Sequence, residues 1–421
     1  MKKGKNRLNK NSRLIIKFIA LVLLCCCFLV FTGCSENIRK KEIVKLINKH
    51  AIYATDVVTK EQLDSSSVEE ILSNDHYAKL YSKEEYAQIK EQNAGNYSGF
   101  GLSFFKGTTV VYSVAINSPA EMTGIKSGDV ITAVTINGVR TETRTFEDLF
   151  STISLVKTNE EVTFSVKTSD LLVKDVTIKK TNYKAGYVTY IDNEKELKVR
   201  TYSNGDFYLQ EFTENRNTDL SNDTAYIGLT EFNGKASEQL QLVLSEIKNK
   251  NKTSVILDLR NNGGGSLDIL IDICEQLLPT SVKKGSPIMF VQYKKGQNVF
   301  TTDKNGQNDY INKLIVLANE NTASASEALI GVLNCYGVGG FNLNNLIVEY
   351  NSSRKNYSTF GKGIMQTTYR LTMGGALKIT TAKIYWPDQI TCIHDIGAEP
   401  TLSSNGVEKG YALNRAISML Y

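Results

Sequence analysis

Two short apolar stretches in the C-terminal half are each followed by a turn and then by a helical pattern. The first stretch, Ser254–Arg260, ends at Asn261–Ser266, which contains three consecutive glycines. The second stretch, Leu314–Leu317, breaks at a polar turn and restarts as a helical pattern over Ala323–Ile330. Strands that alternate with helices build α/β domains. This alternation predicts an α/β domain over residues 182–421.

The rest of the chain divides into two further regions. Residues 34–95 are charged and mostly helical in pattern, and Ser82 with Glu85 has the serine and carboxylate of a capping box. Residues 96–181 read as short strands and turns with one helical segment, Thr145–Val156. The expected fold class is therefore α/β (α+β) and multidomain, with a helical region, a small β domain and the α/β domain.

Residues 1–33 have the features of a signal peptide. They hold seven basic and no acidic side chains, followed by the apolar run Phe18–Phe31. The ending Phe31-Thr-Gly-Cys34 resembles a bacterial lipobox, which implies cleavage before Cys34 and attachment of lipid to it. The alternative is an uncleaved N-terminal anchor. Either way, we expect the body of the protein in the bacterial cell envelope, outside the cytoplasmic membrane.

Removing residues 1–33 also changes the charge balance. Of the 49 basic side chains, seven lie in this segment, which leaves 42 against 44 acidic ones. Such a chain gives no reason to expect nucleic acid as a partner. Outside the lipobox and signal, only Cys274, Cys335 and Cys392 remain, and no His-Glu-x-x-His motif occurs. The sequence therefore predicts neither a metal site nor a cofactor.

Two segments carry candidate chemistry. Ser324 stands where a strand and a sharp turn lead into a helix, a position that exposes a nucleophile and surrounds it with free backbone N–H groups. Lys362 stands between Gly361 and Gly363, beside Phe360. An apolar pocket there lowers the pKa of a lysine, so that its neutral form can take a proton from a serine. The pattern suggests a Ser/Lys hydrolase.

The glycine run after Arg260 has two possible uses. It could cradle a phosphate, but no Gly-Lys-Ser/Thr follows it as in nucleotide-binding loops. Alternatively, its backbone N–H groups could approach a reacting carbonyl, since glycine has no Cβ in the way. The second use fits Ser324 and Lys362 better.

Residues 96–181 resemble a PDZ domain. The resemblance lies in the glycine-containing Gly99–Leu102 loop, in Ser118-Pro-Ala-x-x-x-Gly-Ile-x-x-Gly-Asp-Val-Ile131, and in the following Asn137-Gly138. It implies that a peptide adds as an extra strand and that its terminal carboxylate binds the N–H groups of Gly99, Phe100, Gly101 and Leu102.

The four C-terminal motifs and the domain order resemble the C-terminal processing peptidases, or tail-specific proteases. The motifs are Leu257–Gly265, Thr322–Glu327, Phe360–Gln366 and Leu377–Ala382. The resemblance implies a serine endopeptidase without cofactor that cuts polypeptides, which for this chain would be envelope proteins. One interval departs from the family pattern, because Gly337–Asn345 and Asn351–Ser353 lengthen the segment before Lys362. We expect an inserted surface loop there.

The resemblance also assigns roles to single residues. Ser324 matches the nucleophile, Lys362 the general base, and Gln366 the residue that orients the lysine. The oxyanion donors would be the N–H groups of Ala325 and Gly264, since family members often have proline, which lacks an N–H, where Gly263 stands.

Three alternatives stay open at this point. Ser326, on the same helix, is the rival nucleophile, and His394 beside Asp395 could form part of a Ser/His/Asp triad. The third alternative is a catalytically inactive lipoprotein that uses a protease-like scaffold to bind peptides. Intact Ser324, Lys362 and Gln366 argue against it, because a binding module needs none of them.

Overall fold

The computed structural model describes residues 37–53, 59, 65–201, 206–212, 219–350 and 357–421. The chain divides into two compact units, one made of residues 1–87 and 366–382 and the other of residues 88–365 and 383–421. The signal segment 1–33 and the expected lipid site Cys34 lie outside the described residues. Among the described residues, no helix has the length and apolar character needed to cross a membrane.

The first unit brings together segments from both ends of the chain. Its core contains Ile43 and Ile47 of a helix over residues 37–50, together with Leu371, Leu377 and Ile379. The elements that contribute to it are α3 (Val68–Leu72), β1 (Lys79–Tyr81), α4 (Lys83–Asn93), β19 (Ile364–Arg370) and β20 (Ala376–Tyr385). Strands β1 and β20 pair antiparallel, with Leu80 opposite Leu377.

Two polar contacts in this unit explain its local structure. The predicted capping box before α4 is confirmed, because the Glu85 N–H donates to Ser82 Oγ at 3.0 Å and the Ser82 N–H donates to Glu85 Oε2 at 2.8 Å. The buried Asp75 accepts from the Thr380 N–H at 2.7 Å and from Thr380 Oγ1 at 2.9 Å. Asp75 therefore links the N-terminal segment to strand β20, where Thr380 lies 305 residues later in the sequence.

Residues 96–184 of the second unit form small sheets around one helix. Strands β5 (Val130–Ile136), β6 (Val139–Glu142), β7 (Glu161–Lys167) and β8 (Val173–Lys179) make a sheet in the order β6-β5-β7-β8. Two pairs complete it: β3 (Leu102–Phe104) with β4 (Val111–Val114), and β2 (Asn96–Gly99) with β9 (Thr181–Lys184). Helix α5 (Phe146–Ser154) buries Leu149 in a core that includes Phe100 and Phe164.

The remainder of the second unit is the predicted α/β domain. Its eight-stranded sheet has the order β12-β11-β10-β13-β14-β17-β18-β21 within the described residues. The strands are β10 (Val188–Ile191), β11 (Glu196–Thr201), β12 (Phe207–Phe212), β13 (Thr224–Leu229), β14 (Ser254–Asp258), β17 (Lys313–Asn319), β18 (Leu346–Tyr350) and β21 (Gly406–Glu408). Strands β13, β14, β17, β18 and β21 pair in parallel, and β10–β12 extend the sheet antiparallel.

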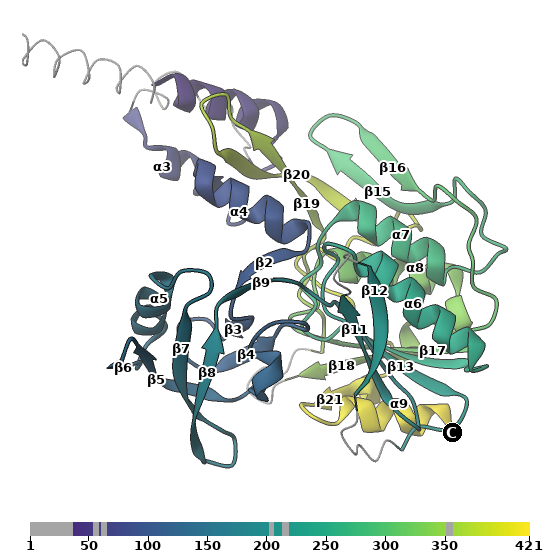
Figure 1. Ribbon diagram of the computed structural model, residues 1–421. Helices are drawn as coiled ribbons and strands as arrows, with labels where there is room; N and C mark the ends of the chain where they lie inside the picture. The colour runs from purple at the N-terminus through teal and green to yellow at the C-terminus, as the bar shows by residue number, and fades with distance from the viewer. Residues whose placement is uncertain (1–36, 54–58, 60–64, 202–205, 213–218, 351–356) are drawn as a thin grey trace, which may run out of the picture. The chain divides into compact units, whose positions relative to one another are not determined.

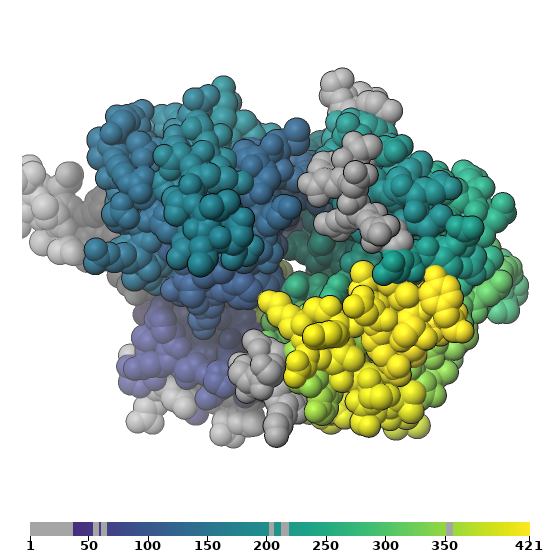
Figure 2. Space-filling model, turned by 90° about the horizontal axis from the view of Figure 1, so that it is seen from below, coloured from purple at the N-terminus to yellow at the C-terminus, as the bar shows by residue number. Residues whose placement is uncertain are grey.

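Helices cover both faces of this sheet. Helices α6 (Ala236–Asn249), α7 (Leu267–Leu277) and α8 (Ala325–Tyr336) lie together on one side, and α9 (Ala412–Leu420) lies on the other (Figure 1). Ala412 and Ala416 of α9 pack on Ile256, Ile315 and Ile347. Figure 2 shows the C-terminal segment with α9, in yellow, at the surface. A hairpin of β15 (Pro287–Tyr293) and β16 (Gln297–Thr301) follows α7.

The segment between α8 and Lys362 is more ordered than a simple surface loop. Gly337 ends α8 in the left-handed conformation, and two short 3-10 turns follow, Val338–Gly340 and Leu343–Asn345. Phe341 is fully buried between these turns, and the chain then enters β18, a buried strand of the sheet. Gly337, Gly340, Asn342 and Asn344 are exposed, so Gly337–Asn345 lies at the surface but is anchored by the buried Val338 and Phe341. Asn351–Ser353 lies outside the described residues.

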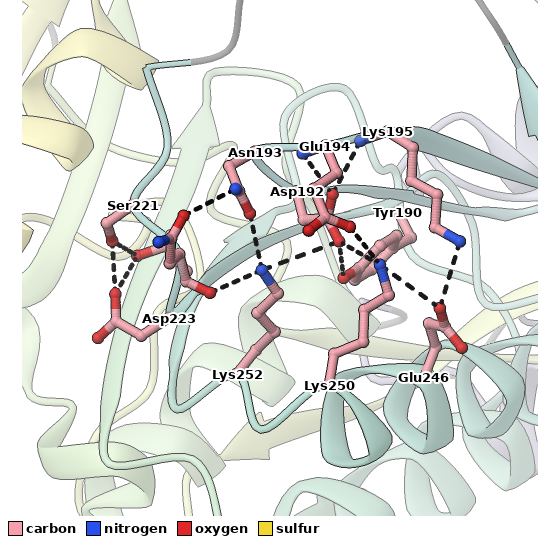
Figure 3. Close-up of polar contacts among 12 residues, drawn as sticks. Tyr190, Asp192, Asn193, Glu194, Lys195, Ser221, Asp223, Glu246, Lys250 and Lys252 are labelled. Carbon is pink, nitrogen blue, oxygen red and sulfur yellow. Dashed lines mark hydrogen bonds and ion pairs between the residues drawn. The ribbon is translucent and has the colours of Figure 1, made fainter.

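An ionic network fastens the β10–β11 turn to the end of α6 (Figure 3). Its centre is Asp192, whose side chain is fully buried and accepts from Tyr190 Oη at 2.6 Å and from Lys250 Nζ at 3.1 Å. Lys252 Nζ lies 3.9 Å from the same carboxylate and donates to the Asn222 carbonyl at 2.7 Å. Burial alone would raise the pKa of Asp192, but these hydrogen bonds and those from nearby backbone N–H groups lower it to about 2.

Candidate active site

Ser324 occupies the N-cap position of α8, directly after the turn that follows β17. Its backbone has φ 58° and ψ −114°, a conformation that non-glycine residues rarely adopt. The turn is held in place by Thr322 Oγ1, which donates to the Leu259 carbonyl at 2.8 Å, and by the Ala323 N–H, which donates to the Asn262 carbonyl at 3.0 Å. The half-buried Ser324 therefore sits on a strained and well-supported corner.

Ser326 has a different environment. It is completely buried, and its Oγ donates to the Asn262 carbonyl at 3.0 Å. That hydrogen bond joins α8 to the glycine loop, so the Ser326 hydroxyl stabilises the structure there. Of the two serines, Ser324 is the one with solvent access.

The glycine loop packs directly against this corner. A Cβ on Gly264 would lie 2.8 Å from the Ala325 nitrogen and 2.9 Å from Ser324 Cβ, and Gly264 has φ 96°. Only glycine fits such an approach. The Gly264 N–H, predicted to be an oxyanion donor, donates to Asn262 Oδ1 at 2.9 Å. For the N–H groups of Ala325 and Gly263, the described residues provide no hydrogen-bond acceptor.

Lys362 lies in a loop that contacts the same corner. The Phe360 N–H donates to the Thr322 carbonyl at 3.0 Å, two residues before Ser324. On its other side the loop meets residues 393–398, where the Asp395 N–H donates to the Gly361 carbonyl at 2.9 Å. A Cβ on Gly363 would lie 2.6 Å from the His394 nitrogen, so this close packing requires glycine.

Glu327 connects the two segments. Its carboxylate, fully buried, accepts from the Ser324 N–H at 2.8 Å and from the Lys362 N–H at 2.9 Å, both at Oε2. Oε1 accepts from Thr359 Oγ1 at 2.6 Å and from the Gly361 N–H at 2.7 Å. Burial raises the pKa of Glu327, and the four hydrogen bonds oppose that shift by favouring its charged form. The sequence analysis assigned no role to Glu327, although its place three residues after an N-cap serine is a capping-box signal.

An ion pair supports the start of the glycine loop. Arg260 contacts Asp258 at the end of β14, and its Nη1 donates to Glu349 Oε2 of β18 at 2.6 Å. Tyr226 Oη of β13 donates to the same Asp258 at 2.6 Å. These contacts link β13, β14 and β18 at the edge of the sheet where Asn261 and the glycines begin.

Gln366 and His394 are the remaining predicted or rival site residues. Gln366 belongs to the first unit, where it is part of the extended strand β19 and its Nε2 donates to the Tyr77 carbonyl at 2.7 Å. His394 Nε2 lies 3.6 Å from Asp395 Oδ2, and the Asp395 side chain is 83% exposed. Among the described residues, no three His, Cys, Asp or Glu side chains gather as metal ligands would.

The predicted peptide-binding loop Gly99–Leu102 connects β2 to β3. Phe100 is buried, and its carbonyl accepts from the Ala120 N–H at 2.9 Å. Gly101 has φ 84°, and a Cβ there would lie 2.0 Å from Ser118 Cβ. The loop lines a cavity of about 710 Å³, which also borders Asn261 beside the glycine loop.

These features agree with the family comparison. Residues 223–340, which carry the glycine loop and Ser324, match the model described as "Peptidase family S41". Within the α/β domain, residues 223–340 are therefore similar to peptidase family S41.

Individual relatives extend the similarity. The chain is 27% identical over 369 residues to a "Probable CtpA-like serine protease" of Staphylococcus aureus, covering 85% of this chain but only 64% of that protein. It is also 27% identical to the carboxyl-terminal-processing protease of a Synechocystis species, over 80% of this chain and 69% of the relative.

Solved structures support the fold. The photosystem II D1 C-terminal processing protease aligns with a TM-score of 0.52 and 20% identity, over 89% of this chain and 93% of that structure. A structure of a "Putative S41 protease" from Bacteroides fragilis aligns with a TM-score of 0.54 and 16% identity, over 90% of this chain and 96% of that structure. At these identities the match establishes the fold, and it confirms the expected mixture of helix and strand.

Proposed function

We propose that the chain is a serine endopeptidase of the C-terminal processing type, with Ser324 as nucleophile and Lys362 as general base. The observation that carries this proposal is the pair of hydrogen bonds from the Ser324 and Lys362 N–H groups to one oxygen of Glu327. A buried carboxylate with these two partners fixes the two backbones relative to each other. Such fixed geometry is what proton transfer between two side chains requires.

In the proposed mechanism, neutral Lys362 takes the proton of Ser324 Oγ while that oxygen attacks the peptide carbonyl. The lysine then gives the proton to the leaving amine as the C–N bond breaks, which leaves an acyl ester on Ser324. Water hydrolyses the ester with Lys362 again as base, so the serine is restored. A positioned base contributes about 100- to 10,000-fold in rate. Following the family resemblance, Gln366 would orient the lysine.

The developing oxyanion needs two N–H donors. We assign one to Ala325, at the positive end of α8. For the second we keep Gly264, where an added Cβ would lie 2.8 Å from the Ala325 nitrogen and 2.9 Å from Ser324 Cβ. Its N–H would exchange Asn262 Oδ1 for the oxyanion. Gly263 is the competing donor.

We further propose that residues 96–181 act as a PDZ domain that binds the C-terminal carboxylate of a polypeptide at Gly99–Leu102. Lipid on Cys34 would hold the protein at the membrane of the cell envelope, and the substrates would be envelope proteins. The curated Staphylococcus relatives are longer than this chain, which spans 64% of their length.

The decisive test is cleavage of an unfolded model protein by the parent and by Ser324→Ala, Ser326→Ala and Lys362→Ala. We expect Ser324→Ala and Lys362→Ala to abolish cleavage. Ser326→Ala should retain cleavage, because it leaves the proposed nucleophile Ser324 in place. Between about pH 6 and pH 10 the parent rate should rise as the lysine deprotonates. A parent without cleavage that still binds peptides would support the inactive binding lipoprotein instead.

A further inference from the structure

The cavity beside the Gly99–Leu102 loop contains a charged group that the proposed mechanism does not use. This group is Glu231, which follows β13 and lines the cavity together with Tyr97, Tyr183 and Tyr187. The neighbouring Phe232 donates its N–H to the Gly264 carbonyl at 3.0 Å. Glu231 therefore stands on the wall between the predicted carboxylate-binding loop and the glycine loop next to Ser324.

Backbone pairing places two of these aromatic rings side by side in the same cavity as Glu231. Tyr97 of β2 and Tyr183 of β9 are directly opposed in register, and their rings stack with centroids 5.5 Å apart. Thr230, the residue before Glu231, donates its N–H to the Tyr187 carbonyl at 2.9 Å. Burial first, and then charges that include that of Glu231, raise the pKa of all three tyrosines. The carboxylate thus lies within electrostatic reach of the three rings.

Glu231 has no cationic partner among the described residues. Its Oε2 accepts from Asn233 Nδ2 at 2.9 Å, and burial raises its pKa. The two cations that line the same cavity are engaged elsewhere. Arg260 pairs with Asp258 and Glu349, and Lys180 Nζ donates to the Val156 carbonyl at 2.6 Å. A desolvated carboxylate that lacks a cation is costly unless a ligand supplies one.

The chemistry of the site selects an organic cation. One carboxylate with tyrosine rings lacks the several oxygen ligands that a divalent metal ion needs. Aromatic faces and a carboxylate together suit an ammonium or guanidinium group. Because the cavity continues to the Gly99–Leu102 loop and to Asn261, its occupant would be an extended polypeptide rather than a small amine.

We propose that Glu231, Tyr97 and Tyr183 form a binding site for a lysine or arginine side chain of a polypeptide that occupies this cavity. The site favours ligands with a basic residue upstream of their free C-terminus. The proposal rests on the proposed function only in taking a polypeptide as the ligand, since binding at this site does not require cleavage.

The test measures peptide binding to the full chain with Ser324→Ala, which prevents cleavage of the probe. The probes are short synthetic peptides with a free C-terminal carboxylate, in which lysine is moved through successive positions and compared with norleucine at the same position. We expect one position at which lysine tightens binding about tenfold. Glu231→Gln should remove this advantage without changing the affinity for the norleucine peptide. The control Glu147→Gln alters an exposed carboxylate of α5 and should leave it intact.

A second pair of variants guards against a folding defect in Glu231→Gln. Tyr183→Leu removes an aromatic face and should reduce the lysine advantage, whereas Tyr183→Phe should keep it. The proposal is overturned if no position prefers lysine, or if the preference survives Glu231→Gln. Separate cleavage assays of the parent distinguish the two hypotheses. A preference for lysine peptides without any cleavage would refute only the proposed peptidase activity. Cleavage without a preference for lysine peptides would refute only the binding site at Glu231.

Discussion

The backbone N–H of Lys362 donates to Glu327 Oε2, the same oxygen that accepts the backbone N–H of Ser324. One buried carboxylate thus sets the relative position of the two residues proposed to carry out proton transfer. The carboxylate accepts from the main-chain N–H groups of these two residues, so it acts on their backbones. A role of this kind can be separated experimentally from a role in the reaction.

Glu327→Gln should reduce kcat at least about tenfold. Each oxygen of Glu327 accepts two hydrogen bonds, and the amide nitrogen of glutamine cannot accept any. The two donors that face this nitrogen therefore lose their acceptor, and the loop that carries Lys362 becomes less firmly held. The free energy of unfolding should fall by about 1 to 3 kcal/mol. Steady-state kinetics and thermal unfolding measure both effects. Glu399→Gln, an exposed control, should change neither, and a fully active Glu327→Gln would contradict the positioning role.

Gly264→Ala should abolish activity and lower the free energy of unfolding by about 3 kcal/mol. The added Cβ would lie 2.8 Å from the Ala323 carbonyl oxygen and the Ala325 nitrogen, at a φ of 96°. Gly263→Ala is the matched control, because a Cβ there meets nothing within 4 Å. Equal unfolding temperatures for the two variants would refute the close approach of the glycine loop to α8.

Gly263→Pro distinguishes the two candidate oxyanion donors. Proline removes the N–H of residue 263 and leaves that of Gly264. If Gly264 is the donor, we expect kcat within about threefold of the parent, since a lost donor costs about 100- to 1,000-fold. A loss of that larger size, with unchanged thermal unfolding, would transfer the assignment to Gly263.

Gly101→Ala should weaken the binding of peptides with a free C-terminal carboxylate. Its Cβ would overlap Ser118, and the Gly99–Leu102 loop would have to move. Gly107→Ala is a close control, because Gly107 also has positive φ but open space around it. We expect an affinity loss of about tenfold or more for Gly101→Ala only. Binding of C-terminally amidated peptides, which lack the carboxylate, should be weak in all three proteins.

Asp192→Asn should destabilise the protein by about 2 kcal/mol at neutral pH. The folded-state pKa of Asp192 is about 2, below the value of an unfolded aspartate. Its charge therefore contributes stability above the unfolded pKa near 4, and this contribution is lost as the pH falls toward 2. Denaturant unfolding of the parent and the variant across this range should show the difference shrinking. A difference independent of pH would contradict the role of the charge.

The sequence predicted those features that depend on neighbouring residues. Ser324 at a helix start and the capping box at Ser82 follow from local patterns, and the structure contains both elements. The task of Glu327 could not be predicted in this way, since its partners Thr359 and Gly361 come from a separate segment brought near by folding. Glu231 likewise has an unremarkable local sequence, and only the pairing of β2 with β9 supplies its aromatic neighbours.

The interval Gly337–Asn345 was predicted only in part. Its glycines and asparagines suggested a surface loop, and several of them are exposed, but Phe341 enters the core and the chain continues into the central sheet. Composition marks where the backbone can turn, whereas burial depends on what the turn packs against. Strand β1 could not be predicted either, because its three residues are too few to show a periodicity. It forms because these residues pair with β20.

The composition of the first unit has a consequence for biosynthesis. Residues 37–87 leave the ribosome about 280 residues before 366–382, the segment that completes their hydrophobic core. At about 5 to 20 residues per second, the early helices wait roughly 15 to 60 s for the strand that carries Leu377 and Thr380. During that interval Ile43, Ile47 and Asp75 lack their final neighbours. A nascent chain is therefore exposed to aggregation and degradation at its beginning until almost its last residues have been made.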